Sequence, residues 1–256
     1  MNPPVLRPQR LLREAARDKA RMQVPIGIGL DSPGVRLRMV ARLRQAGVAS
    51  EAVLAAFEKV PRHQFLDSAL VPQAYEDTSL PIGHGQTISK PSVVARMLEL
   101  LWQSAQAAGR ARLGRVLEIG TGCGYQAALL ALMSDRLSSV ERIGPLHAAA
   151  AQRLNALQRQ LPLCALDLQH ADGQELRPRG APFDAIVSAA GGEAIPESWL
   201  QQLAPGGRLI APLQLAQGQG QRLVVVDRAL VAGASEWRFT EYEAVSFVPL
   251  KSGLLP

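Results

Sequence analysis

The sequence predicts an α/β fold: a doubly wound, mostly parallel, Rossmann-like sheet of seven strands with a small helical portion before it. From residue 115 onward, apolar segments of strand length alternate with helix-forming segments. Such alternation is typical of parallel strands covered by helices on both faces. A glycine-rich turn follows the first strand directly, and 256 residues are enough for one large core.

The part before the sheet contains two short amphipathic helices, predicted over 35–45 and 50–58, with Ser50 as the cap of the second. Residues 61–92 have little periodicity and many turn residues. A stretch of this length without regular structure inside a compact domain is usually functional. A longer helix is predicted over 91–108, with a proline at a favourable early position.

The sheet itself is expected from seven apolar segments and the helices between them. We predict strands over 115–119, 137–141, 163–168, 183–188, 207–212, 221–227 and 236–248, and helices over 124–134, 145–160 and 196–203. The last two strands follow each other like a hairpin, so an antiparallel member is expected at one edge of the sheet.

Residues 116–126 read VLEIGTGCGYQ, in the order strand, glycine turn, helix. Glycine lacks a Cβ, so Gly120, Gly122 and Gly124 can take positive φ and let a ligand lie against bare backbone. The helix that follows presents unpaired N–H groups to that ligand. The glycines alone leave open an ordinary tight turn between strand and helix.

The spacing of the glycines and the acidic residues near the strand ends favour S-adenosyl-L-methionine over a dinucleotide as the ligand. The spacing is G-x-G-x-G rather than the G-x-G-x-x-G that packs around a pyrophosphate. Glu141 ends the second strand about 20 residues after the first glycine, where α/β sites hold ribose hydroxyls. Asp172 and Gly173 follow the third strand and can reach an adenine amino group. The cofactor-binding candidates are therefore Glu118, Gly120, Thr121, Gly122, Gly124, Glu141, Asp172 and Gly173, in a fold of the class I S-adenosylmethionine methyltransferase type.

Basic residues are concentrated at the N-terminus. Residues 1–44 hold ten Lys or Arg and three acids, whereas the rest of the chain holds 18 basic and 19 acidic residues. We expect 1–34 to be a basic, partly disordered extension, with a helix over 9–23 and a linker over 25–33. Such an arm suits either nucleic acid or an acidic partner, or else a solvated segment. We expect the solvated segment and no nucleic-acid partner, because aromatic residues make up only 4% of the chain.

The two cysteines, Cys123 and Cys164, make neither a metal set nor a disulfide framework. We therefore expect no metal ion and a reducing compartment. No apolar run approaches the ~20 residues that span a bilayer, and no secretory signal precedes the domain. These features predict a cytoplasmic protein that does not associate with membranes, and we expect it to be a monomer.

The acceptor can be narrowed by the residues after the fourth strand. Residues 188–192 read SAAGG, so the Asn/Asp-Pro-Pro-aromatic turn of base amino methyltransferases is missing. The nucleophilic cysteine that cytosine C5 chemistry requires is missing there too. We therefore expect the acceptor site to lie in the 61–92 segment.

Over roughly residues 35–250 the chain resembles the protein-L-isoaspartate (D-aspartate) O-methyltransferase family. The resemblance is carried by PRHQFL at 61–66, AYED at 74–77, LPIGHGQTISKP at 80–91, VLEIGTGCGYQAALLA at 116–131, FDAIVSAA at 183–190, LAPGGRLIAPL at 203–213 and FVPL at 247–250. Three positions depart from the usual family pattern: Lys90 before the proline, Ser92 where histidine is common, and Cys123 where serine is common.

The resemblance implies methyl transfer to the free carboxylate of L-isoaspartyl and D-aspartyl residues in age-damaged proteins and peptides, which starts their repair through a succinimide. By analogy Ser89 is the catalytic hydroxyl, and Gln86, Thr87, Ile88 and His84 bind the substrate. The methyltransferase domain would then cover 35–256, with the helical front piece and substrate segment in 35–92 and the cofactor core in 93–256.

The implied reaction needs no general base, because a carboxyl with a pKa near ~4 is already ionised at neutral pH. The protein must align the reacting atoms. Ser89 can donate a hydrogen bond to the carboxylate, and the helix beginning at Pro91 adds a favourable partial charge. The alternative for Ser89 is a helix N-cap. We expect His63 and His84 to have structural or loop roles rather than to act as bases.

Two other functions compete with isoaspartyl methylation. The first is a methyltransferase for another acceptor, such as RNA or a small metabolite, in which the basic extension would be required. The second is a non-catalytic protein that binds the cofactor without turnover.

Overall fold

The computed structural model describes residues 33–175, 180–215, 220–231 and 234–256. The predicted helix over 9–23 lies outside the described residues. So does nearly all of the basic extension and of the linker predicted over 25–33.

Three helices precede the main sheet in the described chain: α2 (Pro33–Gln45), α3 (Glu51–Lys59) and α4 (Pro91–Ala107). They lie within a few residues of the predicted ranges. Ser50 occupies the N-cap position of α3, but its side chain makes no capping hydrogen bond. Its backbone N–H donates instead to a carboxylate oxygen of Glu99 in α4, at 3.2 Å.

The segment over 61–92 is more regular than the sequence predicts. It contains two 3-10 helices, η1 (Arg62–Phe65) and η2 (Ser68–Gln73), and a hairpin of β1 (Leu80–Gly83) and β2 (Gln86–Ile88). The prediction missed this hairpin because its strands have only four and three residues and include proline and glycine, which are rare inside strands.

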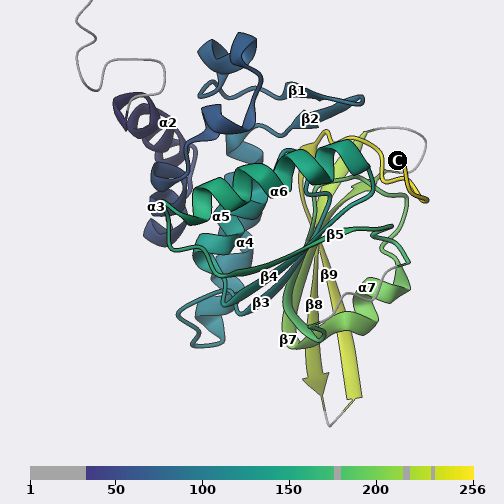
Figure 1. Ribbon diagram of the computed structural model, residues 1–256. Coiled ribbons are helices and arrows are strands. Elements are labelled where there is room, and N and C mark those ends of the chain that lie inside the picture. Colours follow the sequence, from purple (N-terminus) through teal and green to yellow (C-terminus); the bar gives the residue numbers. More distant parts are fainter. Residues whose placement is uncertain (1–32, 176–179, 216–219, 232–233) are drawn as a thin grey trace, which may run out of the picture.

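Seven strands form the main sheet, in the order β5-β4-β3-β6-β7-β8-β9. The first five are parallel, whereas β8 is antiparallel to both of its neighbours. The antiparallel strand and hairpin expected near one edge are therefore present, and β9 forms the edge itself (Figure 1). The strands are β3 (Arg115–Ile119), β4 (Arg136–Glu141), β5 (Ala165–His170), β6 (Phe183–Ser188), β7 (Leu203–Gln214), β8 (Gln221–Val231) and β9 (Ala234–Val245).

Some predicted boundaries are wrong by a few residues. The third strand begins two residues later than predicted and includes His170. The strand predicted over 207–212 begins at Leu203, directly after helix α7 (Glu197–Gln202). The last strand ends at Val245 rather than at 248, so the residues that follow are free to run toward the cavity described below.

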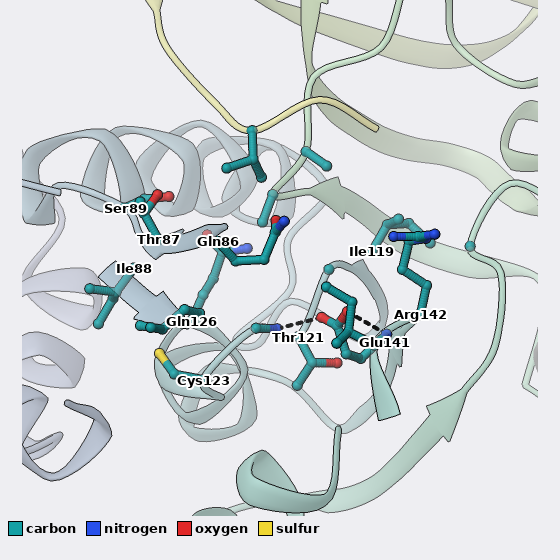
Figure 2. A pocket seen from close by; sticks show the side chains of 18 of the residues that line it. Gln86, Thr87, Ile88, Ser89, Ile119, Thr121, Cys123, Gln126, Glu141 and Arg142 are labelled. Atoms are coloured by element: carbon teal, nitrogen blue, oxygen red, sulfur yellow. Dashed lines mark hydrogen bonds between the residues drawn. The ribbon is translucent and has the colours of Figure 1, made fainter. Parts of the chain in front are cut away.

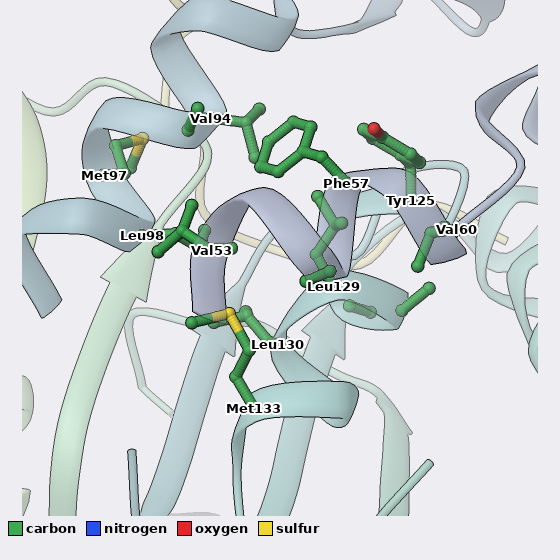
Figure 3. Close-up of a cluster of buried hydrophobic side chains, with 14 of the residues drawn as sticks. Val53, Phe57, Val60, Val94, Met97, Leu98, Tyr125, Leu129, Leu130 and Met133 are labelled. Atoms are coloured by element: carbon green, nitrogen blue, oxygen red, sulfur yellow. The ribbon is translucent and has the colours of Figure 1, made fainter. Parts of the chain in front are cut away.

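Helices cover both faces of the sheet. Val116 of β3 belongs to a core with α2, α3, α4 and α5 (Tyr125–Met133), whereas its neighbour Leu117 packs with Trp199 of α7 on the opposite face. Figure 3 shows how α3, α4 and α5 meet through side chains such as Phe57 and Leu129. This alternation is the two-residue period of a strand buried on both faces.

The chain order places a crevice between β3 and β6. From β3 the sheet grows through β4 and β5 on one side and through β6 and β7 on the other. The connections therefore leave in opposite directions at this point, and ligands of open α/β sheets bind at the carboxyl ends of such strands. Helix α6 (Gly144–Gln158) follows β4 and completes this part of the fold.

Candidate active site

A cavity lies at the carboxyl ends of the central strands. About 880 Å³ of space between atoms lies within it, including the part open to solvent. Its walls come from 119–123 after β3, 140–143 after β4, Gly173 after β5 and 189–190 after β6. The hairpin β1–β2, the starts of α4 and α5, and residues 248–251 form the remaining walls.

The glycine turn supplies bare backbone to this cavity. Gly120 and Gly122 have φ values of 90° and 55°, which favour glycine. A Cβ on Gly122 would lie 3.3 Å from Cδ1 of Ile82, so the hairpin packs directly against the turn. Gly124 has φ 94° and is the N-cap of α5, and it lies outside the cavity lining.

Glu141 is fixed by two backbone N–H groups. One carboxylate oxygen accepts from Gly122 at 2.8 Å, and the other accepts from Ile143 at 3.0 Å. Each oxygen keeps a further lone pair, and the residue lines the cavity. Figure 2 shows Glu141 and Arg142 at one end of the cavity, with Gln86, Thr87 and Ser89 toward the other.

Gly173 makes a flat part of the wall. A Cβ at this position would lie 2.7 Å from Cγ2 of Ile119, which is too close for any side chain without movement. Its neighbour Asp172 lies outside the lining. The two oxygens of Asp172 accept from the backbone N–H groups of Gln174 and Gly253, so this carboxylate joins the β5 loop to the C-terminal segment.

Glu118 lies beneath the glycine turn rather than in the cavity wall. It is fully buried, and one oxygen accepts from the Ser139 hydroxyl at 2.6 Å. Ser139 is in turn 2.6 Å from the Thr121 hydroxyl, which lines the cavity. Burial raises the pKa of Glu118 to about 8, against the opposing effect of the hydrogen bond from Ser139.

The predicted acceptor residues lie on the hairpin side. Gln86, Thr87, Ile88 and Ser89 all line the cavity. The structure thus brings this segment and the glycine turn to the same space. His84 does not line the cavity; it is exposed at the hairpin turn with φ 52°, and its carbonyl accepts from the Gln86 side chain.

Ser89 is not the N-cap of α4. That position belongs to Lys90, which makes no side-chain capping bond. The Ser89 carbonyl accepts a hydrogen bond from Nη2 of Arg62 at 2.7 Å. Ser89 therefore precedes the helix, next to the cavity.

Two further residues singled out in the sequence have structural contacts. His63 lies 2.7 Å from the Tyr75 hydroxyl through its Nδ1. Ser92 donates to Asp77 from both its backbone N–H and its hydroxyl, each at 2.8 Å. Ser92 therefore connects the AYED segment to α4 rather than facing the cavity.

Sequence reasoning missed several cavity residues. Tyr125 and Gln126 begin α5, and Arg142 follows Glu141. Their positions in the sequence could have suggested them, because each comes directly after a strand or turn already placed at the site. Residues 248–251 also line the cavity. Only their family-like FVPL motif singled them out, because no periodicity connects them to the glycine turn.

The C-terminal segment is tied to the cavity by main-chain bonds. Gly191 donates to the Val248 carbonyl at 2.8 Å, and Leu255 donates to the Arg142 carbonyl at 2.9 Å. The Gly144 N–H donates back to Leu255 at 2.8 Å. Residues 248–255 therefore run along the open side of the site.

Within the residues that the structure describes, each helix is either too short or not apolar enough to cross a bilayer.

The chain is similar to known proteins over most of its length. The family model for protein-L-isoaspartate(D-aspartate) O-methyltransferase matches residues 36–254. A protein-L-isoaspartate O-methyltransferase of Leptothrix cholodnii is 55% identical over 96% of this chain and 84% of its own length. One of Methylibium petroleiphilum is 52% identical over 98% of this chain and 89% of its own.

Two solved structures share the fold. One is a Plasmodium falciparum protein described as a protein-L-isoaspartate O-methyltransferase, in complex with S-adenosyl-L-homocysteine; it has a TM-score of 0.70 and 22% identity over 84% of this chain and 97% of its own. The other is also described as a protein-L-isoaspartate O-methyltransferase; it has a TM-score of 0.68 and 26% identity over 86% of this chain and 67% of its own.

Proposed function

This chain belongs to the protein-L-isoaspartate(D-aspartate) O-methyltransferase family, and on that premise we propose a role for each part of the cavity. The enzyme transfers a methyl group from S-adenosyl-L-methionine to the free carboxylate of L-isoaspartyl and D-aspartyl residues in damaged proteins. This transfer starts their repair through a succinimide. The proposal for the site is supported chiefly by one observation: residues 86–89 and the glycine turn face one cavity.

The cofactor end fits a ligand that consists of an adenine, a ribose and an amino acid. Glu141 is held by two N–H groups and retains lone pairs for the two ribose hydroxyls. Gly120, Thr121 and Gly122 present backbone along the wall, and Gly173 leaves room for a flat ring. Glu118, Gly124 and Asp172 would then act from behind the wall, because they support the turns that touch the cofactor.

When bound, S-adenosyl-L-methionine supplies an electrophilic methyl group on a sulfonium sulfur. The residues of this chain have to bring the acceptor to it. In our proposal, Ser89 donates a hydrogen bond to one oxygen of the substrate carboxylate, while the other oxygen faces the methyl group. Gln86, Thr87 and Ile88 hold the peptide beside it, with the exposed His84 at the rim. Fixing one orientation in this way supplies much of the rate enhancement of such a transfer.

The proposed mechanism has no general base, since the carboxylate is already ionised at neutral pH. The thiol and the phenol that line the cavity are consistent with this mechanism. Burial raises the pKa of the Cys123 thiol and that of the Tyr125 phenol. Both groups therefore stay protonated at neutral pH, so neither is suited to remove a proton.

The test uses labelled cofactor with an isoaspartyl peptide and its normal aspartyl twin. We expect label only on the isoaspartyl peptide. Equal labelling of both, or labelling of neither, would contradict the proposed acceptor.

The role of Ser89 is tested by Ser89→Ala, with Ser92→Ala as the matched control. Both substitutions remove one hydroxyl near the start of α4, but Ser92 lies outside the cavity lining. We expect Ser89→Ala to lower kcat about 10-fold or more, with little change in the affinity for S-adenosyl-L-homocysteine. A large loss of that affinity would show that Ser89 belongs to the cofactor end.

We further propose that the enzyme is a cytoplasmic monomer that acts on proteins and peptides without nucleic acid. The free thiols of Cys123 and Cys164 suit a reducing compartment. Deleting residues 1–34 separates the acceptor classes: an isoaspartyl enzyme should retain its activity. Abolished activity would favour another acceptor, such as RNA, bound by the basic extension.

A further inference from the structure

Arg62 in η1 is completely buried, which is rare for arginine. Its guanidinium lies directly behind the acceptor side of the cavity. Nη2 donates to the Ser89 carbonyl at 2.7 Å, and the centre of the guanidinium lies 4.8 Å from the centre of the Tyr125 ring. Both Ser89 and Tyr125 line the cavity.

The other partners of Arg62 are also uncharged. Nε donates to the Ala74 carbonyl at 2.8 Å, and Nη2 is 3.5 Å from the Thr78 carbonyl. These bonds join η1 to the loop before β1 and to the end of β2. They explain how a segment with so little regular structure holds one conformation.

Within the described part of the chain, none of the ion pairs includes Arg62. Asp77 is the smallest of the influences that favour the charged form of Arg62. Both oxygens of Asp77 accept hydrogen bonds from Ser92. A buried charge without a counter-ion is costly. Burial lowers the pKa of Arg62, yet a guanidinium stays protonated in proteins.

We propose that Arg62 is a specificity-determining residue: its buried positive charge favours an acceptor that brings a carboxylate to Ser89, and its bond to the Ser89 carbonyl positions that residue. The inference rests on the proposed function, because it places the acceptor carboxylate at Ser89. The substrate then supplies the negative charge that the protein itself does not place next to Arg62.

Arginine suits this role better than lysine. A lysine at a buried position readily loses its proton, whereas a guanidinium keeps its charge and can donate several bonds from one plane. The field of such a charge is also screened much less by salt than that of an exposed charge, because Arg62 is completely buried. Lys90 and Lys251 are exposed, so their attraction for an anion should weaken as salt is added.

The experiment measures binding of two peptides in the presence of S-adenosyl-L-homocysteine, which prevents turnover. One carries the isoaspartyl carboxylate, and the other carries a carboxamide in its place. For the unmodified enzyme we expect the acid to bind at least about tenfold more tightly than the amide. For Arg62→Gln we expect this ratio to approach one, with the affinity for S-adenosyl-L-homocysteine changed less than about threefold.

Lys90→Gln is the matched control, since it also removes one positive charge beside Ser89. It should leave the ratio near that of the unmodified enzyme. If Arg62→Gln weakens both peptides equally, Arg62 has only a structural role and the inference is overturned. The inference is also overturned if Lys90→Gln, rather than Arg62→Gln, removes the preference.

A second measurement does not require any variant to fold. The acid-to-amide ratio of the unmodified enzyme is compared at about 50 mM and about 500 mM salt. A ratio that persists supports the buried charge, whereas a ratio that collapses assigns the preference to exposed lysines. Failure of the proposed function would look different, because the unmodified enzyme would then not distinguish isoaspartyl from aspartyl peptides in the methylation assay.

Discussion

Replacing Glu118 by glutamine should change how the stability of the enzyme depends on pH. The side chain is fully buried, and its pKa is raised from 4.5 to about 8. Between these two pH values the folded protein keeps a proton on Glu118 that the unfolded chain releases. Raising the pH therefore favours unfolding in this window, and the stability contributed by the neutral carboxyl is lost as pH approaches 8.

The size of the effect follows from the difference between the pKa of Glu118 in the folded protein and its pKa in the unfolded chain. At 1.36 kcal/mol per pKa unit, a rise from 4.5 to about 8 corresponds to at most about 5 kcal/mol of unfolding free energy. Glutamine has nearly the shape of the protonated acid, and its carbonyl can still accept from Ser139. We therefore expect Glu118→Gln to be within about 1 kcal/mol of the unmodified enzyme near pH 6.

The assay is denaturant unfolding of both proteins from about pH 5 to about pH 9. Because other groups titrate equally in both, the difference between the two curves isolates Glu118. It should grow with pH by a few kcal/mol in favour of Glu118→Gln. If the unfolding free energies of the two proteins instead differ by a constant amount across this pH range, Glu118 does not hold its proton. The reasoning from burial would then be wrong.

Three further substitutions test other parts of the site. Gly173→Ala should cost about 1–3 kcal/mol, because its Cβ would lie 2.7 Å from Ile119; thermal unfolding measures the loss, and adding Ile119→Ala should make the combined cost less than additive. Glu141→Gln should weaken S-adenosyl-L-homocysteine at least about tenfold in a calorimetric titration, because the amide cannot accept from both backbone N–H groups. Gln221→Ala should raise KM several-fold with little loss of kcat, because the Gln221 side chain bonds both the N–H and the carbonyl of Phe247 before the cavity wall; unchanged steady-state constants would contradict that role.

The local sequence pattern was sufficient to predict the part of the fold in which strands and helices alternate. Strand and helix alternation from residue 115 onward predicted the sheet, because most of its strands contain a short apolar run and the segments between them favour helix. The glycine turn was recognisable because its glycines follow a strand and precede a helix. Strand ends then placed Glu141 and Gly173 at the cavity without any knowledge of distant contacts.

The remainder depends on contacts between distant segments. From the sequence alone Arg62 would be expected at the surface, because arginine is rarely buried. Only the fold of 61–92 around it shows that it is buried. Glu118 sits inside an apolar strand, but its environment comes from Ser139 on the neighbouring strand. The hairpin before α4 was missed because strands this short are stabilised by packing against the glycine turn rather than by their own composition.

The last wall of the cavity has a consequence for synthesis. Because residues 248–251 follow every other part of the pocket along the chain, a nascent chain that has been made only to the end of β9 lacks one wall of the cavity. That wall takes its place only once residues 248–255 have emerged and bonded to Gly191 and Arg142. The cavity is therefore completed only after all of its other walls have been synthesised.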